Sequence, residues 1–344
     1  MYRRFLPMTW SERRIVTILS TILLILMAAL LVVLGMRYRA SRDIGKEAPA
    51  PGDTGVVTDQ NAYTSLQYDN GSTTLSFTRD ENGTWTWDGS RDFPLDDTVI
   101  TSILELLTNW KPQQILTGAE AVEKSGLSEP VASLTAVTAS GAVTTVLFGN
   151  TTTDGDSYYA RLNGDETTVY IVADTLYRLM TVPVYDMYDL PELPELREDR
   201  IQSITVQGPS PDGDLPGTLT VLTAQRAEAD TATTWRSSGA NVTDVPLVQS
   251  LLEDVTALTI TKCVDFDPSA EAASICGLDT PAATLNVTYA TEGGAQQALH
   301  ITVGSRLPDG SGRYIRLGDD TTLFFLPTEL LDPLMRIAAE GLGD

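Results

Sequence analysis

Gly126-Leu127-Ser128-Glu129-Pro130 and Gly277-Leu278-Asp279-Thr280-Pro281 are two versions of one short turn motif in this 344-residue chain. Similarity at a fixed offset is the signature of an internal repeat, which predicts that the segments on either side of the two motifs match as well. Matching residues extend in both directions and in the same order. The sequence therefore predicts two tandem copies of one module.

The matches outside the turn define a repeat motif. Downstream, Phe148-Gly149 matches Val303-Gly304, Tyr159-Ala160-Arg161-Leu162 matches Tyr314-Ile315-Arg316-Leu317, and Leu179-Met180 matches Leu334-Met335. Upstream, a strand with Trp85 or Trp235 precedes a helical pattern. The motif positions are Trp85, Asp96, Gly126, Leu127, Pro130, Gly149, Tyr159 and Arg161 in the first copy, and Trp235, Asp244, Gly277, Leu278, Pro281, Gly304, Tyr314 and Arg316 in the second.

Each copy contains one predicted amphipathic helix. Apolar residues recur at helical spacing, namely Val99, Ile100, Ile103, Leu104, Leu107 and Trp110, and then Leu247, Val248, Leu251, Leu252, Val255 and Leu258. This spacing places one apolar stripe toward a core. Asp96 and Asp244 precede the two helices, where a carboxylate can accept the unpaired N–H groups of the first turn.

The remaining pattern is mainly antiparallel β structure. Apolar residues alternate with Thr and Ser, as in strands with one buried face, and turns such as Asn82-Gly83 and Asn163-Gly164 tolerate positive φ. A short helix closes each copy. The predicted fold class is α+β. Its elements are strands Ser65–Tyr68, Thr74–Thr78, Thr84–Trp87, Ser133–Thr138, Thr144–Phe148, Tyr158–Leu162, Thr168–Val172, Ser203–Val206, Thr218–Thr223, Thr234–Arg236, Ala283–Tyr289, Leu299–Val303, Tyr314–Leu317 and Thr322–Leu326, and closing helices Leu176–Met180 and Leu330–Ile337.

Residues 15–36 read IVTILSTILLILMAALLVVLGM and carry no charge. At about 1.5 Å per residue, a helix of this length crosses the hydrocarbon core of a bilayer. The run is longer than the apolar part of a cleaved signal peptide and ends in Arg37-Tyr38-Arg39, which favours an uncleaved anchor. Basic residues are equally numerous on both sides, so orientation follows the common arrangement for an exported domain, with the N-terminus in the cytoplasm.

These features divide the chain into seven parts. They are a cytoplasmic head (1–14), a transmembrane helix (15–36), a stalk (37–58), repeat module 1 (59–182), a Pro-rich acidic connector (183–198), repeat module 2 (199–338) and a tail (339–344). The predicted localisation is the cell membrane, with a single pass and the bulk of the chain extracytoplasmic. The lipid bilayer is a predicted partner through residues 15–36.

The charge is strongly acidic outside the N-terminal segment. Eight of the 23 Lys and Arg and two of the 46 Asp and Glu lie in the first 46 residues, which leaves 15 basic and 44 acidic residues for the rest. Nucleic-acid binding draws on Lys and Arg to neutralise phosphates, so no nucleic-acid partner is predicted.

The Trp strand, the Asp-preceded helix, the Gly-Leu-x-x-Pro turn, the Phe-Gly strand end and the Tyr-x-Arg-Leu strand together resemble the domain-of-unknown-function 4340 family. The resemblance covers residues of roughly 60–340. It implies one N-terminal anchor and an accessory role beside gliding-motility-type ABC transporters, with a permease and an ATPase as partners. It brings no catalytic residues with it.

No motif for a catalytic or cofactor site stands out, so no enzyme activity, cofactor or metal is predicted. His300 is the only histidine and falls in a strand pattern, which predicts a solvent-facing residue. Cys263 and Cys276 are the only cysteines, and either a disulfide or two buried thiols would suit them. Acidic turns such as Asp154-Gly155-Asp156, Asp212-Gly213-Asp214 and Asp319-Asp320 lack the EF-hand spacing and are predicted to be solvated.

Trp85, Trp87, Tyr158 and Tyr159 could form an aromatic platform, but alternate members of such runs usually fill a core. The leading hypothesis is a non-catalytic, membrane-anchored extracytoplasmic scaffold or adaptor, an accessory subunit of an ABC-type transport complex. The alternative is an extracytoplasmic protein that binds a small molecule or a cell-envelope glycan between its copies. A third interpretation is an enzyme that acts on envelope polymers through a pair of carboxylates.

Overall fold

The structure is a computed structural model that describes residues 56–209, 217–226 and 233–343. The predicted head, transmembrane helix and most of the stalk lie outside these residues, as does the turn Asp212-Gly213-Asp214. Within the described ranges, no helix has the length and apolar character that a membrane span requires.

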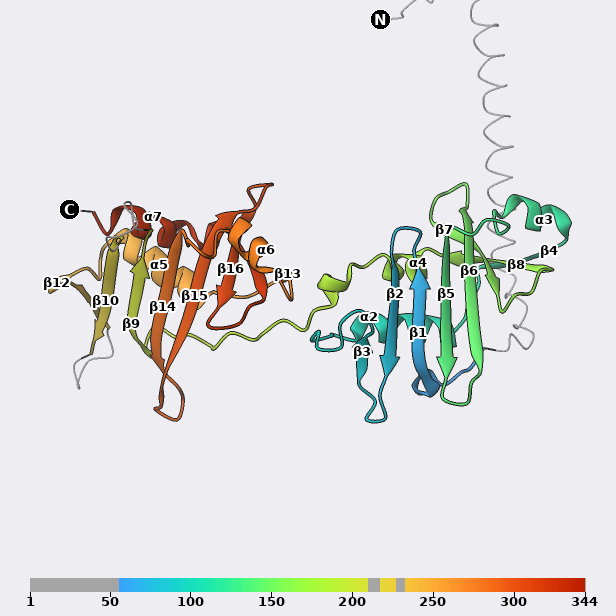
Figure 1. The fold of residues 1–344 in the computed structure, drawn as a ribbon, viewed down its shortest axis with the longest axis horizontal. Coiled ribbons are helices and arrows are strands. Elements are labelled where there is room, and N and C mark those ends of the chain that lie inside the picture. Colours follow the sequence, from blue (N-terminus) through green and yellow to red (C-terminus); the bar gives the residue numbers. More distant parts are fainter. Residues whose placement is uncertain (1–55, 210–216, 227–232, 344) are drawn as a thin grey trace, which may run out of the picture.

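The described residues form two antiparallel sheets with few helices, which confirms the α+β class (Figure 1). The first sheet has the strand order β3-β2-β1-β5-β6-β7-β8-β4. Its strands are β1 (Tyr63–Asp69), β2 (Thr74–Arg79), β3 (Trp85–Trp87), β4 (Gln114–Thr117), β5 (Ala132–Thr138), β6 (Val143–Thr151), β7 (Ser157–Leu162) and β8 (Thr168–Ala173). Its helical segments are η1 (Gln60–Ala62), α2 (Thr98–Thr108), α3 (Ala119–Lys124) and α4 (Thr175–Met180), followed by η2 (Val184–Met187).

The second sheet has the order β12-β11-β10-β9-β14-β15-β16-β17-β13. Apart from the edge strand β12, each strand has a counterpart at the same place in the first sheet. The strands are β9 (Ile201–Gln207), β10 (Leu219–Gln225), β11 (Thr234–Ser237), β12 (Ala240–Asn241), β13 (Lys262–Asp265), β14 (Ala283–Ala290), β15 (Gln296–Arg306), β16 (Gly312–Leu317) and β17 (Leu323–Pro327). The helical segments are α5 (Pro246–Thr256), α6 (Ala270–Ile275), η3 (Thr328–Leu330) and α7 (Asp332–Glu340).

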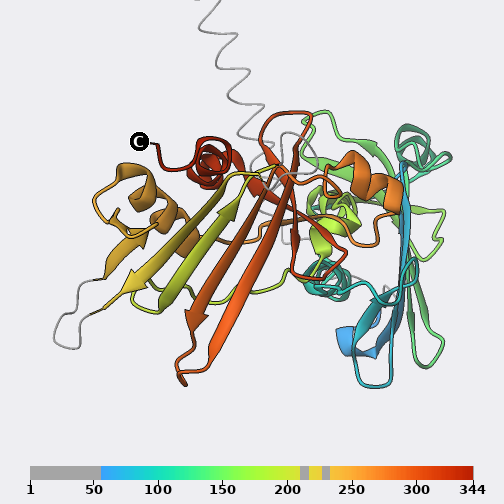
Figure 2. The ribbon, with the colours of Figure 1, turned by 60° about the vertical axis from the view of Figure 1, so that its left-hand side comes forward.

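One face of each sheet is covered by helices, and the core lies between them. Helix α2 buries Ile100, Ile103, Leu104 and Leu107, and α5 buries Val248, Leu251, Leu252 and Val255, so both predicted stripes face a core. In Figure 1 the long helices α2 and α5 lie behind the strands, whereas α6 lies in front of β16, and Figure 2 shows α5 and α7 on the same side of the second sheet. Burial of each such aliphatic side chain contributes about 1.5–3 kcal/mol.

The predicted caps of the two long helices differ in outcome. Asp96 accepts hydrogen bonds from the backbone N–H and the hydroxyl of Thr98, although Asp97 occupies the N-cap position of α2. The prediction for Asp244 was wrong, because α5 has Val245 at its N-cap and no side chain bonded there. Pro246 is the first residue of α5 and has no N–H to cap, which reduces the need for a carboxylate.

All predicted strands are present, with ends that differ by a few residues. The second closing helix starts at Asp332 instead of Leu330, because Pro333 favours the first turn and Thr328–Leu330 forms a separate 3-10 turn. Besides β12 and the 3-10 turns, four short elements were not predicted: β4, α3, β13 and α6. They lie between the long helix and the Gly-Leu turn, where the runs are too short to display a period.

The Gly-Leu turn is tied to the end of a strand in both sheets. The carbonyl oxygen of Ser125 accepts a hydrogen bond of 2.7 Å from Asn150 N–H, and that of Cys276 accepts one of 2.7 Å from Ser305 N–H. A Cβ on Gly149 would lie 2.1 Å from the Ser125 oxygen, and a Cβ on Gly304 would lie 2.2 Å from the Cys276 oxygen. We call this contact the carbonyl–glycine dock. Only a residue without a side chain allows it.

The turn glycines and leucines complete the dock. Gly126 and Gly277 have φ of 72° and 73°, the left-handed conformation in which glycine is favoured. Leu127 and Leu278 are buried and pack over Gly149 and Gly304. Pro130 and Pro281 stand immediately before the first residues that pair with the docked strands, Val131 and Ala282. Six of the predicted motif glycines and leucines thus have a structural role.

Replacing a docked glycine should destabilise the fold. Gly149→Ala and Gly304→Ala force the backbone apart, and we expect each to lower the free energy of unfolding by about 1–3 kcal/mol, as overpacking does. The measurement is thermal and urea unfolding of the detergent-solubilised chain followed by circular dichroism. Gly293→Ala is the matched control, since its nearest atom would be at 3.9 Å and its φ is not positive. Equal stability of the three variants would contradict the role of the dock.

Candidate interaction surfaces

The face of each sheet opposite its long helix carries mostly Thr, Ser and other uncharged residues, and in the second sheet α6 covers part of this face beside β16 (Figure 1). On the first sheet, register places Thr86, Thr78, Ser65 and Val137 in one row, Ser76, Gln67, Thr135 and Thr145 in the next, and Thr74, Asp69, Ser133, Leu147 and Arg161 in a third. Asp69 is the acidic residue among them. Its carboxylate accepts hydrogen bonds from the Gly71 N–H at 2.7 Å and the Thr74 hydroxyl at 2.9 Å. Both bonds lower the pKa of Asp69, and the bond from Gly71 has the larger effect.

The Tyr-x-Arg motif lies on the same side as these open faces, although Tyr314 packs there against the cluster of Cys276, Leu278 and Leu323. Ala160 and Ile315 are buried in the cores, so the residues that flank them, Tyr159 with Arg161 and Tyr314 with Arg316, point the other way. The Nε atoms of Arg161 and Arg316 are buried without a hydrogen-bond partner. These two side chains therefore lie against the sheet.

The Trp positions of the motif belong to the cores. Trp85 and Trp235 are buried, and Trp235 donates its indole N–H to Glu198 at 3.1 Å. Tyr158 stacks on Tyr177 with ring centroids 4.4 Å apart. The four aromatic residues of the first copy therefore do not make one platform: Trp85 and Tyr158 face a core and Tyr159 faces outward.

Trp87 lies at a junction of aromatic residues that links the two sheets. Phe93, from the loop between β3 and α2, contacts Trp87, Tyr188 and Phe266 edge to face, with ring centroids 5.3, 5.3 and 5.5 Å apart. Tyr188 in turn contacts Phe324 of β17. The aromatic junction, defined as Trp87, Phe93, Tyr185, Tyr188, Phe266 and Phe324, thus packs residues of both halves into one cluster.

The connector is part of this packing. Tyr185 and Tyr188 belong to the junction, Leu196 is buried, and the Tyr185 hydroxyl donates to Asp265 at 3.4 Å. Burial raises the pKa of Tyr185, and the nearby Asp265 carboxylate adds to the shift. The connector therefore lies along the core of the second sheet for part of its length.

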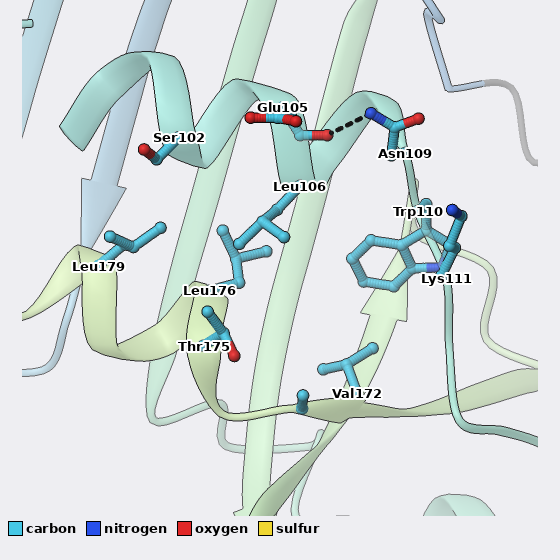
Figure 3. Close-up of a pocket in the computed structure, with 11 residues that line it drawn as sticks. Ser102, Glu105, Leu106, Asn109, Trp110, Lys111, Val172, Thr175, Leu176 and Leu179 are labelled. Carbon is cyan, nitrogen blue, oxygen red and sulfur yellow. Dashed lines mark hydrogen bonds between the residues drawn. The ribbon is translucent and has the colours of Figure 1, made fainter. Parts of the chain in front are cut away.

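A groove of about 650 Å³ lies between α2, α4 and the end of β8 (Figure 3). Leu106, which is 36% exposed, points from α2 toward Leu176 of α4, and Trp110 forms one end. Ser102, Glu105, Asn109, Lys111 and Thr175 contribute polar groups at the rim. The groove could hold an apolar group with a hydrogen-bonding end. Sequence reasoning missed it, because the residues come from segments far apart in the chain.

The residues that could take part in catalysis or metal binding lie apart from one another. His300 is exposed on β15 opposite Asn286, as predicted for a solvent-facing strand residue. Asp154 accepts hydrogen bonds from the Thr152 hydroxyl and the Asp156 N–H within its turn. Both bonds lower the pKa of Asp154, and the bond from Thr152 has the larger effect. Among the described residues, no group of three or more His, Cys, Asp and Glu is placed to hold a metal ion.

Cys263 and Cys276 are free, buried thiols that belong to different hydrophobic clusters, so the disulfide alternative does not hold in this structure. Cys263 lies in the unpredicted strand β13, and Cys276 ends α6 and supplies the docked carbonyl. Burial raises the pKa of Cys263 to about 12 and also raises that of Cys276.

Loss of Phe93 should loosen the connector. Phe93→Ala removes a buried ring from the aromatic junction, and we expect a loss of about 3–5 kcal/mol in local stability. Trypsin should then cut faster at Arg197 and Arg200 in the connector region, measured by mass spectrometry of timed digests. Tyr159→Ala on an open face is the control and should leave the cleavage rate unchanged. Equal rates in both variants would mean that the junction does not hold the connector.

Both thiols should resist alkylation in the folded chain. A raised pKa keeps a thiol protonated, and only the thiolate attacks iodoacetamide, so labelling at about pH 8 should be slow without denaturant and fast in urea. Because the pKa of Cys263 is raised in the folded chain, its contribution to the free energy of unfolding is complete below about pH 9. This contribution is lost as pH rises toward 12. The measurement is the mass gain without prior reduction. Failure to label in urea unless a reductant is added would establish a disulfide.

Comparison with known proteins gives one match. The family model described as Domain of unknown function (DUF4340) matches residues 85–264, from the Trp strand β3 to strand β13, which is just over half of the chain. No curated protein matches the chain, and no solved structure matches it. On the strength of the family match, and as the motif predicted, the chain belongs to the domain-of-unknown-function 4340 family.

Proposed function

We propose that this chain is a membrane-anchored, extracytoplasmic scaffold or adaptor, an accessory subunit of an ABC-type transport complex without catalytic activity of its own. Its soluble part is built from two copies of one module. The anchor is residues 15–36, the N-terminus lies in the cytoplasm, and the modules project from the outer surface of the cell membrane.

The observation that carries the proposal is the character of the open sheet faces. They are broad and nearly free of acidic side chains, in a chain with 46 acidic and 23 basic residues. Depletion of charge is typical of the centre of a protein–protein interface. A scaffold needs such surfaces.

The aromatic junction supports the same function. It packs Phe93 against Tyr188 and Phe266, so the contact between the halves is a core contact, with ring centroids 5.3 and 5.5 Å apart. Aromatic residues at this junction are thereby occupied with each other instead of being free for a ligand. An adaptor whose two faces are held in a fixed relation can position two partners at once.

A second candidate function is binding of a small molecule or an envelope glycan. The groove beside Leu106 and Leu176 favours it, because apolar clefts of this size with a few polar groups are typical of ligand sites. A thermal-shift screen of metabolites and glycans would test it. A ligand whose stabilising effect disappears in Leu106→Glu would favour this function over the scaffold.

The adaptor function predicts stable partners. Affinity purification of the full-length chain from its own membranes, in mild detergent, should recover a permease and an ATPase at near-equal amounts, identified by mass spectrometry. A chain tagged in the same way but lacking residues 56–344 is the control, and should recover neither. Recovery of the full-length chain alone would contradict the proposal.

A further inference from the structure

The open face of the second sheet differs from the rest of the chain in charge. Strand alternation and register place on it three rows, here called the arginine face. They are Arg236, Thr223, Ser203, Thr288 and Ala298, then Val221, Thr205, Asn286 and His300, then Leu219, Gln207, Thr284, Thr302 and Arg316. None of these described positions is acidic, whereas acidic residues outnumber basic ones two to one in the chain as a whole.

The two arginines stand at opposite corners of this face. Arg236 belongs to β11 and Arg316 to β16, five strand steps apart in the sheet order. At about 4.8 Å per step, the face is about 24 Å wide. An occupant that reaches both charges must therefore be extended or broad.

Both guanidinium groups are held close to the sheet. The Nε atoms of Arg236 and Arg316 are buried without a hydrogen-bond partner, and Arg236 donates through Nη1 to the Gly239 carbonyl at 2.8 Å. In the described part of the chain, neither arginine has a carboxylate partner. Fixed side chains lose less freedom on binding, and unpaired guanidinium groups favour carboxylates or phosphates.

The apolar residues of the face decide between kinds of anion. Leu219 and Val221 are neighbours on the outer side of β10 and are 59% and 41% exposed. A polysaccharide has no aliphatic side chains to cover them, and a single lipid headgroup cannot reach two charges at opposite corners of the face. A polypeptide with acidic and aliphatic residues meets both requirements.

We propose that the arginine face docks an extended acidic segment of a partner protein, with Arg236 and Arg316 as its charge contacts and Leu219 and Val221 as its apolar contacts. This inference rests on the proposed adaptor function and names the chemistry of one partner. The acidic character of the remaining surface repels the same segment, so docking is confined to this face.

The first experiment uses a fluorescent peptide of about eight residues that repeats Glu-Glu-Leu-Leu, which spans about 26 Å when extended and presents both Glu and Leu on each side. Fluorescence anisotropy with the detergent-solubilised full-length chain should give saturable binding that weakens as salt is raised. The double variant Arg236→Gln/Arg316→Gln should weaken binding tenfold or more. Arg91→Gln/Arg178→Gln, which removes the same charge elsewhere, should stay within about twofold of the parent.

Two further probes distinguish other anions. Hyaluronate presents carboxylates on a polysaccharide, and phosphatidylglycerol vesicles present lipid phosphates. Binding of either with the same dependence on Arg236 and Arg316, without binding of the peptide, would overturn the proposal. So would equal affinity for a peptide with Gln in place of Glu, or equal affinity of the two double variants. Thermal unfolding of each variant establishes that the fold is retained.

The membrane purification separates this inference from the adaptor function. If the parent chain recovers transporter subunits and Arg236→Gln/Arg316→Gln loses them, the arginine face is the docking surface. If both recover the subunits equally, the face assignment is wrong and the adaptor function stands. If the parent recovers none, the adaptor function fails whatever the peptide result.

Discussion

The fold depends on the carbonyl–glycine dock, in which a backbone oxygen bonds to the end of a central strand. The oxygen of Ser125 or Cys276 lies so close to Gly149 or Gly304 that no side chain fits between them. The bonded strand bulges beside the contact, in β6 between Phe148 and Thr151 and in β15 between Val303 and Arg306. Each dock fixes the point where the chain enters β5 or β14, after the short edge strand and the short helix that follow the long helix.

That re-entry point decides which face of the sheet is open. From the dock, β5 and β14 pair with β1 and β9 in the register that points Leu134 and Leu285 toward the helices. A slip of one residue would exchange the two faces. The Thr-rich surfaces, and the arginines on them, therefore owe their outward direction to the dock.

Much of this was predictable from the sequence, because the period of strands and helices is visible where segments are long. The turn leucines and glycines recur in both copies and were therefore predictable, although the contact that they make was not. Ser125 and Cys276 occupy the same place in the two copies but differ in side chain. Both act through the backbone carbonyl, so the identity of the side chain does not predict the contact. The aromatic junction was missed for another reason: Phe93 and Phe266 meet only through the tertiary fold.

The distribution of charge is related to the same division of each sheet into a core face and an open face. Acidic residues gather in turns, where Asp80, Asp165 and Asp309 accept bonds from nearby N–H groups, and hydrogen bonding lowers the pKa of each. Turns lie at the strand ends, so these carboxylates lie at the ends of the strands, whereas the three rows of the arginine face carry no acidic residue. The arginine face is thus free of the charges that would oppose an acidic partner. The arginines need not overcome the whole net charge, because the turn carboxylates lie at the strand ends, where solvent screens them.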